Sequence, residues 1–187
     1  EEIATANRIL AHHHVVDSFG HISVRHPENP NHFLMSRARA PACIEDGDIM
    51  EFTLDGQVVG AEVGKPYSER FIHGAVYEAR PDVMAVVHSH SLAVVPFSIV
   101  KGVPFRAVCH MGGFIGICAP IFEIRDIAGD ASDLLIRNSE LGAGVAKVLG
   151  EGSVVLMRGR RYRDHNEKVA AAKAKYAQFT DPDHPVF

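Results

Sequence analysis

The sequence predicts an α/β fold, a single domain in which helices pack about a mostly antiparallel sheet. Its 187 residues suit one domain rather than several. With 47% hydrophobic and 22% charged residues, the composition is that of a globular protein, which excludes disordered and fibrous classes. Short alternating segments typical of strands occur between segments with helical spacing, and no repeat or linker interrupts them. We therefore expect residues 1–187 to form one domain.

The N-terminal part of the chain predicts one helix followed by strands. Apolar residues at helical spacing from Ile3 predict an opening helix that ends before Ser18. Asp55-Gly56 predicts a hairpin turn, because glycine readily adopts the positive φ angle that a tight turn requires. The strands expected here are residues 21–25, residues 32–36 and the two arms of the hairpin, 49–54 and 57–60.

Helices and buried strands alternate in the rest of the prediction. A helix is expected over residues 68–80, with Ser68 as its N-cap. The apolar, β-branched run 83–88 predicts a buried strand. The later elements are, in order, a short helix beginning within 91–98, a helix over 133–149 with small residues on one face, a buried strand over 153–157 and an alanine-rich surface helix over 168–177.

The charge balance and the cysteines exclude several classes of protein. Nineteen Lys and Arg against 23 Asp and Glu give a net charge of −4, which is the wrong balance for binding a nucleic-acid backbone. Three cysteines without Cys-x-x-Cys spacing indicate neither a disulfide framework nor a thiolate zinc site, so the expected location is the cytoplasm. The first residues lack a signal-peptide profile, and no apolar run approaches the roughly 18 residues of a spanning helix, so no membrane partner is expected.

The sharpest chemical signal is His88-Ser89-His90, at the end of an expected strand. Side chains two apart on a strand point to the same side, so His88 and His90 can hold one divalent ion. Two solvated histidines are the alternative, but a rigid buried strand favours a metal site. In the tract His12-His13-His14, by contrast, consecutive helical side chains point in different directions, which argues against a shared metal.

Two more segments carry candidate binding groups. Glu69 falls in the first turn of an expected helix, where the macrodipole stabilises a carboxylate, and it is either a functional acid or only a capping acid. Arg37 and Arg39 follow a strand, and they either converge on a planar anion or remain exposed.

Taken in order, these segments resemble the class II aldolase/adducin family over residues 3–159. The resemblance implies a three-layer α/β/α fold with a central, mostly antiparallel sheet, usually in a homotetramer with sites at subunit boundaries. It also implies one divalent metal ion, Zn, Mn, Co, Fe or Mg, held by His88 and His90, with Glu69 as the acid or base beside it. The matching stretches are residues 19–25, 35–41, 65–69, 85–90 and 155–159.

The sequence departs from the members of that family that cleave sugar phosphates. His21 stands where an Asn is typical, residues 36–41 replace a Ser-Gly pair, and Tyr67-Ser68 replaces a Ser-Ser pair. Together with residues 70–73 and the segment 109–114, which contains His110, these changes resemble the branch that decarboxylates aromatic or ring-cleaved hydroxy acids. The dihydroxyphthalate and carboxylated muconic-semialdehyde decarboxylases are the nearest models.

A third metal-binding histidine normally follows an Arg-Gly pair in this family. Here Arg158-Gly159 runs into Arg160 instead. Either His165 or water completes the coordination, or the chain lacks a segment after residue 159. We expect a missing segment, because the strand and helix that usually follow in the family are also absent from the sequence.

The resemblance therefore implies a metal-dependent decarboxylase of a carboxylated catechol or a related hydroxy or oxo acid in aromatic catabolism. The metal would act as a Lewis acid for the electrons left when CO2 departs, as in retro-aldol cleavage. Glu69 or His110 would deliver a proton to the carbanionic carbon. Two alternatives stay open: an aldolase acting on a non-phosphorylated or keto-acid aldol, and a non-catalytic adducin-like scaffold. The residues expected to bind the small carboxylate substrate are Arg37, Arg39, His21, Ser36 and Ser68.

Overall fold

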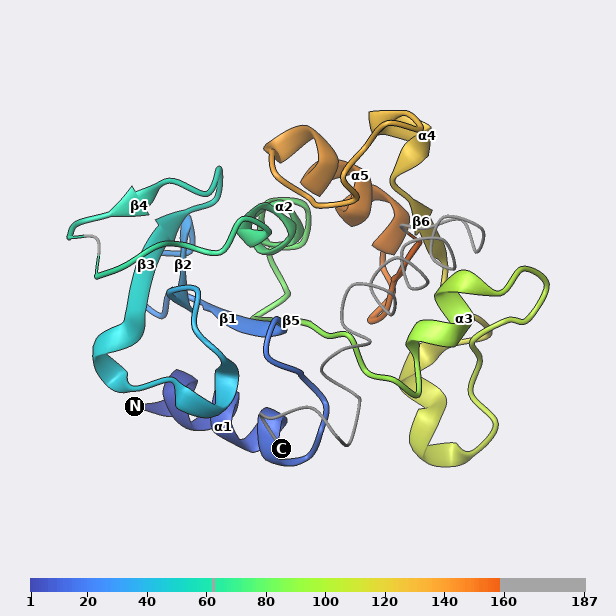
Figure 1. Cartoon of the computed structure of the whole chain (residues 1–187), viewed down its shortest axis with the longest axis horizontal. Coiled ribbons are helices and arrows are strands. Elements are labelled where there is room, and N and C mark those ends of the chain that lie inside the picture. Colours follow the sequence, from blue (N-terminus) through green and yellow to red (C-terminus); the bar gives the residue numbers. More distant parts are fainter. Residues whose placement is uncertain (62, 159–187) are drawn as a thin grey trace, which may run out of the picture.

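An antiparallel sheet forms the centre of the computed structural model, which describes residues 1–61 and 63–158 (Figure 1). The strands lie in the order β4-β3-β2-β1-β5, and every neighbouring pair is antiparallel. The two strands predicted at 21–25 and 32–36 are confirmed, as is the hairpin turn, where Gly56 has a φ of +81°. The strands are β1 (His21–Arg25), β2 (His32–Ser36), β3 (Ile49–Thr53), β4 (Val58–Val59) and β5 (Ala85–His88).

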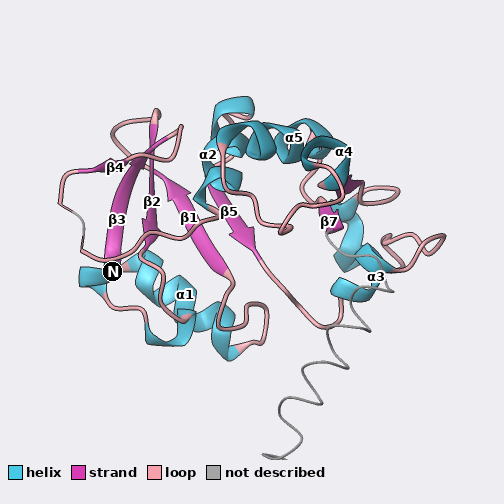
Figure 2. Cartoon of the chain, turned by 45° about the horizontal axis from the view of Figure 1, so that its top comes forward, coloured by secondary structure: helices cyan, strands magenta, loops and turns pink. Residues whose placement is uncertain are grey.

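Helices cover both faces of this sheet. On one side α1 (Glu2–His12) contacts β1 and β2, while α2 (Arg70–Ala79) and α5 (Ser139–Leu149) lie on the other side (Figure 2). Burying one apolar stripe of a helix against a sheet face is how such layers gain stability. The predicted α/β fold is confirmed. The core between the sheet and α2 contains Phe33, Met35, Met50, Phe52 and Tyr77.

A second, smaller sheet lies beside α5. In it β6 (Ile121–Glu123) and β7 (Leu156–Arg158) pair in parallel, with Ile121 opposite Leu156. The strand predicted at 153–157 therefore corresponds to β7, outside the antiparallel sheet, and β6 was not predicted. The core cluster around this sheet contains Ile72, Phe122, Ile124, Ile136, Leu141 and Val145. The shorter elements are α3 (Val95–Ile99), α4 (Arg125–Ala128) and the 3-10 turns Pro41–Cys43, Asp46–Asp48 and His110–Ile115.

The starts of two helices differ from the prediction. Ser68 is not an N-cap, because it lies in a turn and α2 begins only at Arg70. The helix expected from residue 133 begins at Ser139. Its true cap is Asn138, whose side chain accepts the Leu141 N–H at 2.9 Å.

The strand predicted at 83–88 is not buried. β5 is an edge strand that pairs only with β1 among the described residues, and Ala85 and Val87 are exposed. A continuous apolar run predicts burial on both faces. Here, among residues 1–61 and 63–158, no strand pairs with the second edge of β5, and the side chains of Ala85 and Val87 are exposed.

Several expectations concern chemistry and location rather than folding. The three cysteines are free thiols, so the expected absence of a disulfide framework is confirmed. None of the helices in the described ranges combines the length and the apolar character that a membrane span requires, and the cytoplasmic location stays a prediction. The surface helix expected at 168–177, the alternative ligand His165 and the question of a missing segment all lie outside the described residues.

A close contact between α2 and α5 fixes how these helices cross. A Cβ atom at Gly142 would lie 2.3 Å from the Phe71 carbonyl oxygen, so only glycine permits this approach. The small residues predicted on one face of α5 are therefore confirmed, and their packing places the N-terminal end of α2.

We predict that Gly142→Ala lowers the free energy of unfolding by about 1–3 kcal/mol, the usual cost of overpacking. The loss should appear although alanine is the better helix former. Urea denaturation of both proteins measures the difference. The control is Gly47→Ala, where a Cβ meets nothing within 4 Å and where a change of no more than about 0.5 kcal/mol is expected. A Gly142→Ala protein as stable as the wild type would contradict this packing.

Candidate metal and acid–base site

The pairing of β1 with β5 brings two histidines together. His21 lies directly opposite His88 in the ladder, and their rings stack with centroids 4.9 Å apart. The loop before β1 packs tightly here, since a Cβ atom at Gly20 would lie 3.0 Å from the His88 carbonyl oxygen. The register of the sheet thus places His21 and His88 side by side at the end of β5.

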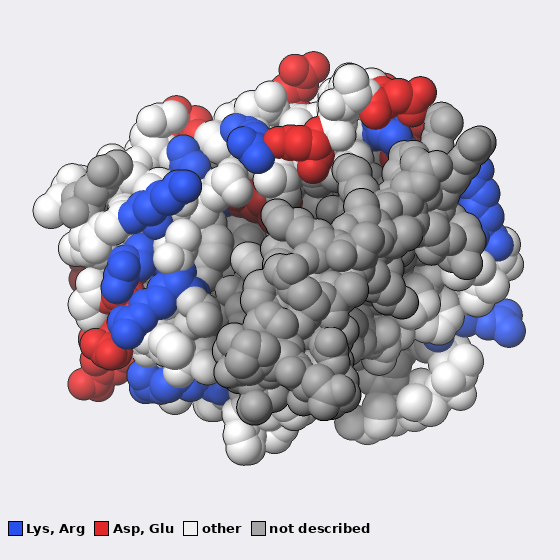
Figure 3. Space-filling model, viewed as in Figure 1, with Lys and Arg blue, Asp and Glu red and all other residues white. Residues whose placement is uncertain are grey.

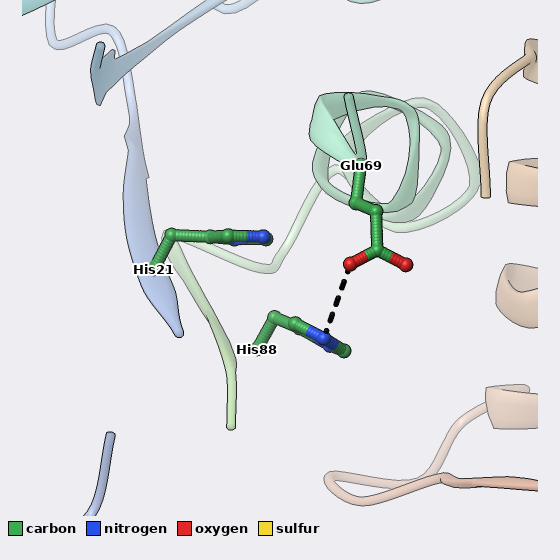
Figure 4. Close-up of side chains that lie close together, drawn as sticks. All are labelled: His21, Glu69 and His88. Carbon is green, nitrogen blue, oxygen red and sulfur yellow. Dashed lines mark ion pairs between the residues drawn. The ribbon is translucent and has the colours of Figure 1, made fainter. Parts of the chain in front are cut away.

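Glu69 reaches this site from the start of α2. One possible ligand atom from each of His21, Glu69 and His88 lies within 4.8 Å of the others (Figure 4). The Glu69 Oε2 atom is 3.5 Å from His88 Nε2, the contact that Figure 4 marks with a dashed line. Segments that are far apart in the sequence therefore place a carboxyl group and two imidazole rings close together.

The protonation of the site follows from its burial. Burial raises the pKa of Glu69 above its ordinary value, although the Ile136 N–H and the charge of His90 act in the opposite direction. Burial, together with the charge of His90, lowers the pKa of His88 to about 4. The carboxyl group is thus pushed toward its protonated form and the imidazole toward its neutral form.

Two expectations about Glu69 are therefore corrected. Its charged form is not favoured by the helix, since desolvation outweighs the macrodipole and the pKa rises. It is also not a capping acid. Glu69 occupies the N-cap position of α2 but makes no side-chain cap, and its Oε1 accepts the Ile136 N–H at 3.4 Å instead.

His90 lies beside His88 and is oriented by an acid. The Nε2 atoms of the two rings are 3.0 Å apart, and His90 Nδ1 lies 3.3 Å from both carboxylate oxygens of Asp17. Partial burial opposes ionisation of Asp17, but the N–H groups of Phe19 and Gly20 and the charge of His90 lower its pKa. A carboxylate that accepts Nδ1–H leaves Nε2 of that histidine with its lone pair.

This donor set fits a divalent metal ion. Neutral imidazoles and a carboxylate are the ligands that first-row metals take, and an outer carboxylate on a ligating histidine is a common support. His88 and His90 would hold a metal, with Glu69 within reach of His88, and their role as ligands stays a prediction. Asp17 was not predicted, although the run Asp17-Ser18-Phe19-Gly20 has the pattern of an Asx turn, which the structure contains.

A hollow of about 400 Å³ opens beside Ser68, the residue that precedes Glu69 in the sequence. Its wall includes Ser68, Tyr67 and the cations Arg39, Lys65 and Arg137. Figure 3 shows basic side chains gathered toward the left of this face, where Figure 1 places β3 and the loops around it. Within the described ranges, no ion pair or hydrogen bond holds the Lys65 ammonium group. The hollow is therefore suited to an anion.

The two predicted arginines already converge on a carboxylate within the chain. Arg37 Nε donates to Asp48 Oδ1 at 2.5 Å, and Arg39 Nη1 donates to Asp48 Oδ2 at 2.7 Å. The Arg37 hydrogen bond, the Glu45 N–H and Arg39 lower the pKa of Asp48 to about 2 despite its burial. Only Arg39 of this pair also lines the hollow.

The other predicted residues are placed differently. Ser68 lines the hollow, but Ser36 is fully buried at the end of β2 and does not. His110 is exposed in a 3-10 turn and makes no contact with Glu69 or His88 in the part of the chain that the structure describes. Their roles stay predictions.

The site continues into the protein interior through His73, which was not predicted. It lies one turn after Glu69 on α2 and its side chain is fully buried. Burial lowers the pKa of His73 to about 3 and, with the charge of His73, holds the pKa of His21 well below its usual range. The spacing of Glu69 and His73, four residues on one helix, is the signal that could have identified it.

Residues 1–160 match the model of the class II aldolase and adducin N-terminal domain. The chain belongs to this family. Decarboxylase tropJ of Talaromyces stipitatus is 42% identical over 166 residues, which cover 82% of this chain and 62% of that protein. The 3,4-dihydroxyphthalate decarboxylase of Arthrobacter keyseri is 34% identical over 169 residues, which cover 85% and 65%. The chain thus spans less than two thirds of both relatives.

A solved structure of an L-fuculose 1-phosphate aldolase has the same fold. It superposes with a TM-score of 0.69 over 97% of this chain and 87% of that chain, at 20% sequence identity. The family resemblance found in the sequence, and its decarboxylase branch, are thereby confirmed.

We predict that acid removes the stabilisation that Asp48 provides. Its pKa of about 2 lies below the ordinary value of 3.8, so its contribution is present above pH 3.8 and is lost as the pH falls toward 2. Asp48→Asn should therefore have a lower Tm than the wild type near neutral pH, and the gap should close near pH 2. Thermal unfolding followed by circular dichroism measures both. A gap that stays constant across this range would contradict the arginine clamp.

Proposed function

We propose that this protein is a metal-dependent decarboxylase of a carboxylated catechol or a related hydroxy or oxo acid. The observation that carries the proposal is that the Glu69 carboxyl group, whose pKa is raised by burial, lies beside His88, whose pKa is lowered by burial, and that His90 lies next to His88. A hollow with cationic side chains on its wall is lined by Ser68, the residue before Glu69. Two relatives named as decarboxylases support the same reaction class.

The chemistry divides between the metal and the side chains. A divalent ion, once bound by His88 and His90, supplies Lewis-acid stabilisation of negative charge on the substrate's hydroxyl or oxo group. Glu69 is the proposed proton donor next to this position, because burial raises its pKa and so favours the protonated form. It can deliver that proton to the ring carbon from which CO2 departs.

The hollow supplies the binding of the substrate's negative charge. Arg39, Lys65 and Arg137 surround it, and a guanidinium group pairs bidentately with a carboxylate. Because Arg39 is already held by Asp48, its position is fixed before substrate binds. Lys65 is the cation with the greatest freedom to pair with an incoming carboxylate. A substrate with two carboxylates would place one in the hollow and lose the other as CO2.

A homo-oligomer, usually a tetramer in this family, is part of the same proposal. Large apolar side chains are exposed around the segment that carries His110. Patches of this kind mark interaction surfaces. In such an assembly we expect His110 to contribute to the site of a neighbouring copy, since the described residues place it in no contact with Glu69 or His88 of its own chain. The exposed apolar side chains include Leu92 at 89%, Val108 at 87%, Met111 at 83% and Ile117 at 95%.

The decisive assay supplies the metal-loaded protein with 3,4-dihydroxyphthalate and measures CO2 release. We expect turnover with this substrate and negligible cleavage of ketose or aldose phosphates. Glu69→Gln should fold and bind metal but turn over roughly 100-fold more slowly or worse, the scale of a positioned acid or base. The matched control is Glu78→Gln, an exposed glutamate of the same helix, which should keep wild-type turnover.

Two results would count against the proposal. Efficient cleavage of a sugar phosphate without CO2 release from any carboxylated catechol would return the protein to the aldolase branch. Absence of both activities from the metal-loaded protein would favour the non-catalytic scaffold. Wild-type turnover by Glu69→Gln would remove only the role given to Glu69.

We also predict about one divalent metal ion per chain. Metal analysis of the purified protein should show it, and the double variant His88→Ala, His90→Ala should lose it because both imidazoles are removed. The control is the double variant His12→Ala, His13→Ala, two exposed histidines at the end of α1, which should keep full occupancy. Unchanged metal content in the first variant would place the metal elsewhere.

A further inference from the structure

A hydrogen-bonded chain of four side chains runs from the site into the core. His21 Nδ1 lies 2.7 Å from His73 Nε2, and His73 Nδ1 lies 2.6 Å from Ser23 Oγ. Ser23 Oγ lies 2.8 Å from the Tyr77 hydroxyl. All four side chains are at most 1% exposed. A buried chain of this kind is stable only when every donor meets an acceptor, so the position of one proton determines the others.

The Tyr77 end fixes the direction of the chain. Burial raises the pKa of Tyr77 to about 12, so its hydroxyl group keeps a proton that must be donated. The acceptor found for it among the described residues is Ser23 Oγ. Tyr77 therefore donates to Ser23.

The remaining protons follow in order. Ser23, having accepted from Tyr77, donates its own proton to His73 Nδ1. His73 is fully buried, so it stays neutral and carries its proton on Nε2. That proton is donated to His21 Nδ1. A neutral His21 whose Nδ1 is an acceptor carries its proton on Nε2.

The ring of His21 is held so that this proton faces the site. Tyr67 packs against the ring with centroids 4.5 Å apart, and His88 stacks on it at 4.9 Å. Figure 4 shows the ring extending from β1 toward Glu69 and His88. With Nδ1 engaged by His73, the nitrogen that remains for the site is Nε2.

We propose that Tyr77, Ser23 and His73 are positioning residues that fix the tautomer of His21, so that its Nε2–H is a hydrogen-bond donor to a substrate oxygen and not a metal ligand. A protonated imidazole nitrogen has no lone pair to coordinate with. His21 therefore lies close to Glu69 and His88 but does not belong to the set of metal ligands. Preorganised donors of this kind stabilise negative charge as it develops on oxygen.

The tautomer of His21 is independent of the proposed function. The identity of the substrate oxygen that accepts from Nε2–H rests on the proposed function. A carboxylated catechol presents a carboxylate and phenol oxygens, and either can accept from Nε2–H. The His21 Nε2–H group would add a neutral hydrogen-bond donor, which neither a metal ion nor the cationic side chains of the hollow supply.

The first experiment determines the tautomer of His21 in the wild-type protein. Protein labelled with 15N in its histidines is studied by long-range 1H–15N NMR, and His21 is assigned by comparison with His21→Asn. We expect an unprotonated Nδ1 and a protonated Nε2, and the same pattern after one equivalent of Zn2+ while the His88 and His90 signals shift. A protonated Nδ1, or coordination of zinc at His21 Nε2, would overturn the inference.

The second experiment breaks the chain at a distance from the site. Tyr77→Phe and Ser23→Ala each remove one hydroxyl group, and each should give a mixture of both His21 tautomers. The control is Ser98→Ala, another buried serine, which should leave the His21 signals unchanged because the Ser98 hydroxyl group donates to the Val95 carbonyl oxygen, outside the chain of four side chains. If both chain variants fold and keep the single wild-type tautomer, His73 and its partners are only structural.

The third experiment separates this inference from the proposed function. Addition of 3,4-dihydroxybenzoate to the zinc protein should shift the His21 Nε2–H signal. With an active enzyme, Tyr77→Phe should lower kcat/KM about 10-fold, the effect of one lost hydrogen bond near 1.4 kcal/mol. If the protein keeps the Nε2–H tautomer but releases no CO2, the result would contradict only the proposed substrate and would leave the tautomer of His21 unaffected. A catechol carboxylate that binds without shifting Nε2–H would reject the donor role.

Discussion

The register of the β1–β5 pair is the constraint on which the site depends. Because His21 and His88 are directly opposite, one histidine faces the interior chain through His73 and the other faces His90. A slip of one residue in either strand would send the histidine of that strand to the other face of the sheet, away from its partner. The loop before β1 is locked to β5 by the close approach of Gly20 to the His88 carbonyl, which resists such a slip.

Burial shifts the pKa values of the groups that this register brings together in opposite directions. It raises the pKa of the Glu69 carboxyl group and lowers that of His88, so both tend toward their neutral forms before any ligand binds. Asp48 shows the contrasting solution. It is equally removed from solvent but stays ionised, because two arginines donate to it. The protein thus keeps charge where it supports the fold and the hollow, and a proton where chemistry is proposed.

The sequence predicted the parts of this arrangement that depend on local pattern. The strands around Ser23 and Phe33, the hairpin at Gly56 and the histidine pair at the end of β5 follow from alternation, turn chemistry and spacing. What it did not predict arises from tertiary packing. Nothing local indicates that β5 is an edge strand, that β7 pairs with β6, or that Asp17 meets His90 from 73 residues away.

The central claim is that the Glu69 and His88 cluster transfers a proton to a ring carbon, and solvent exchange tests it most directly. Loss of one carboxylate from 3,4-dihydroxyphthalate leaves 3,4-dihydroxybenzoate, and a group that protonates this ring in one direction must remove the same proton in the other. In D2O the metal-loaded protein should incorporate deuterium into 3,4-dihydroxybenzoate at one ring carbon, adjacent to a hydroxyl group. The Glu69→Gln variant should not catalyse this exchange. No incorporation by the wild type, or equal incorporation by Glu69→Gln, would contradict the account.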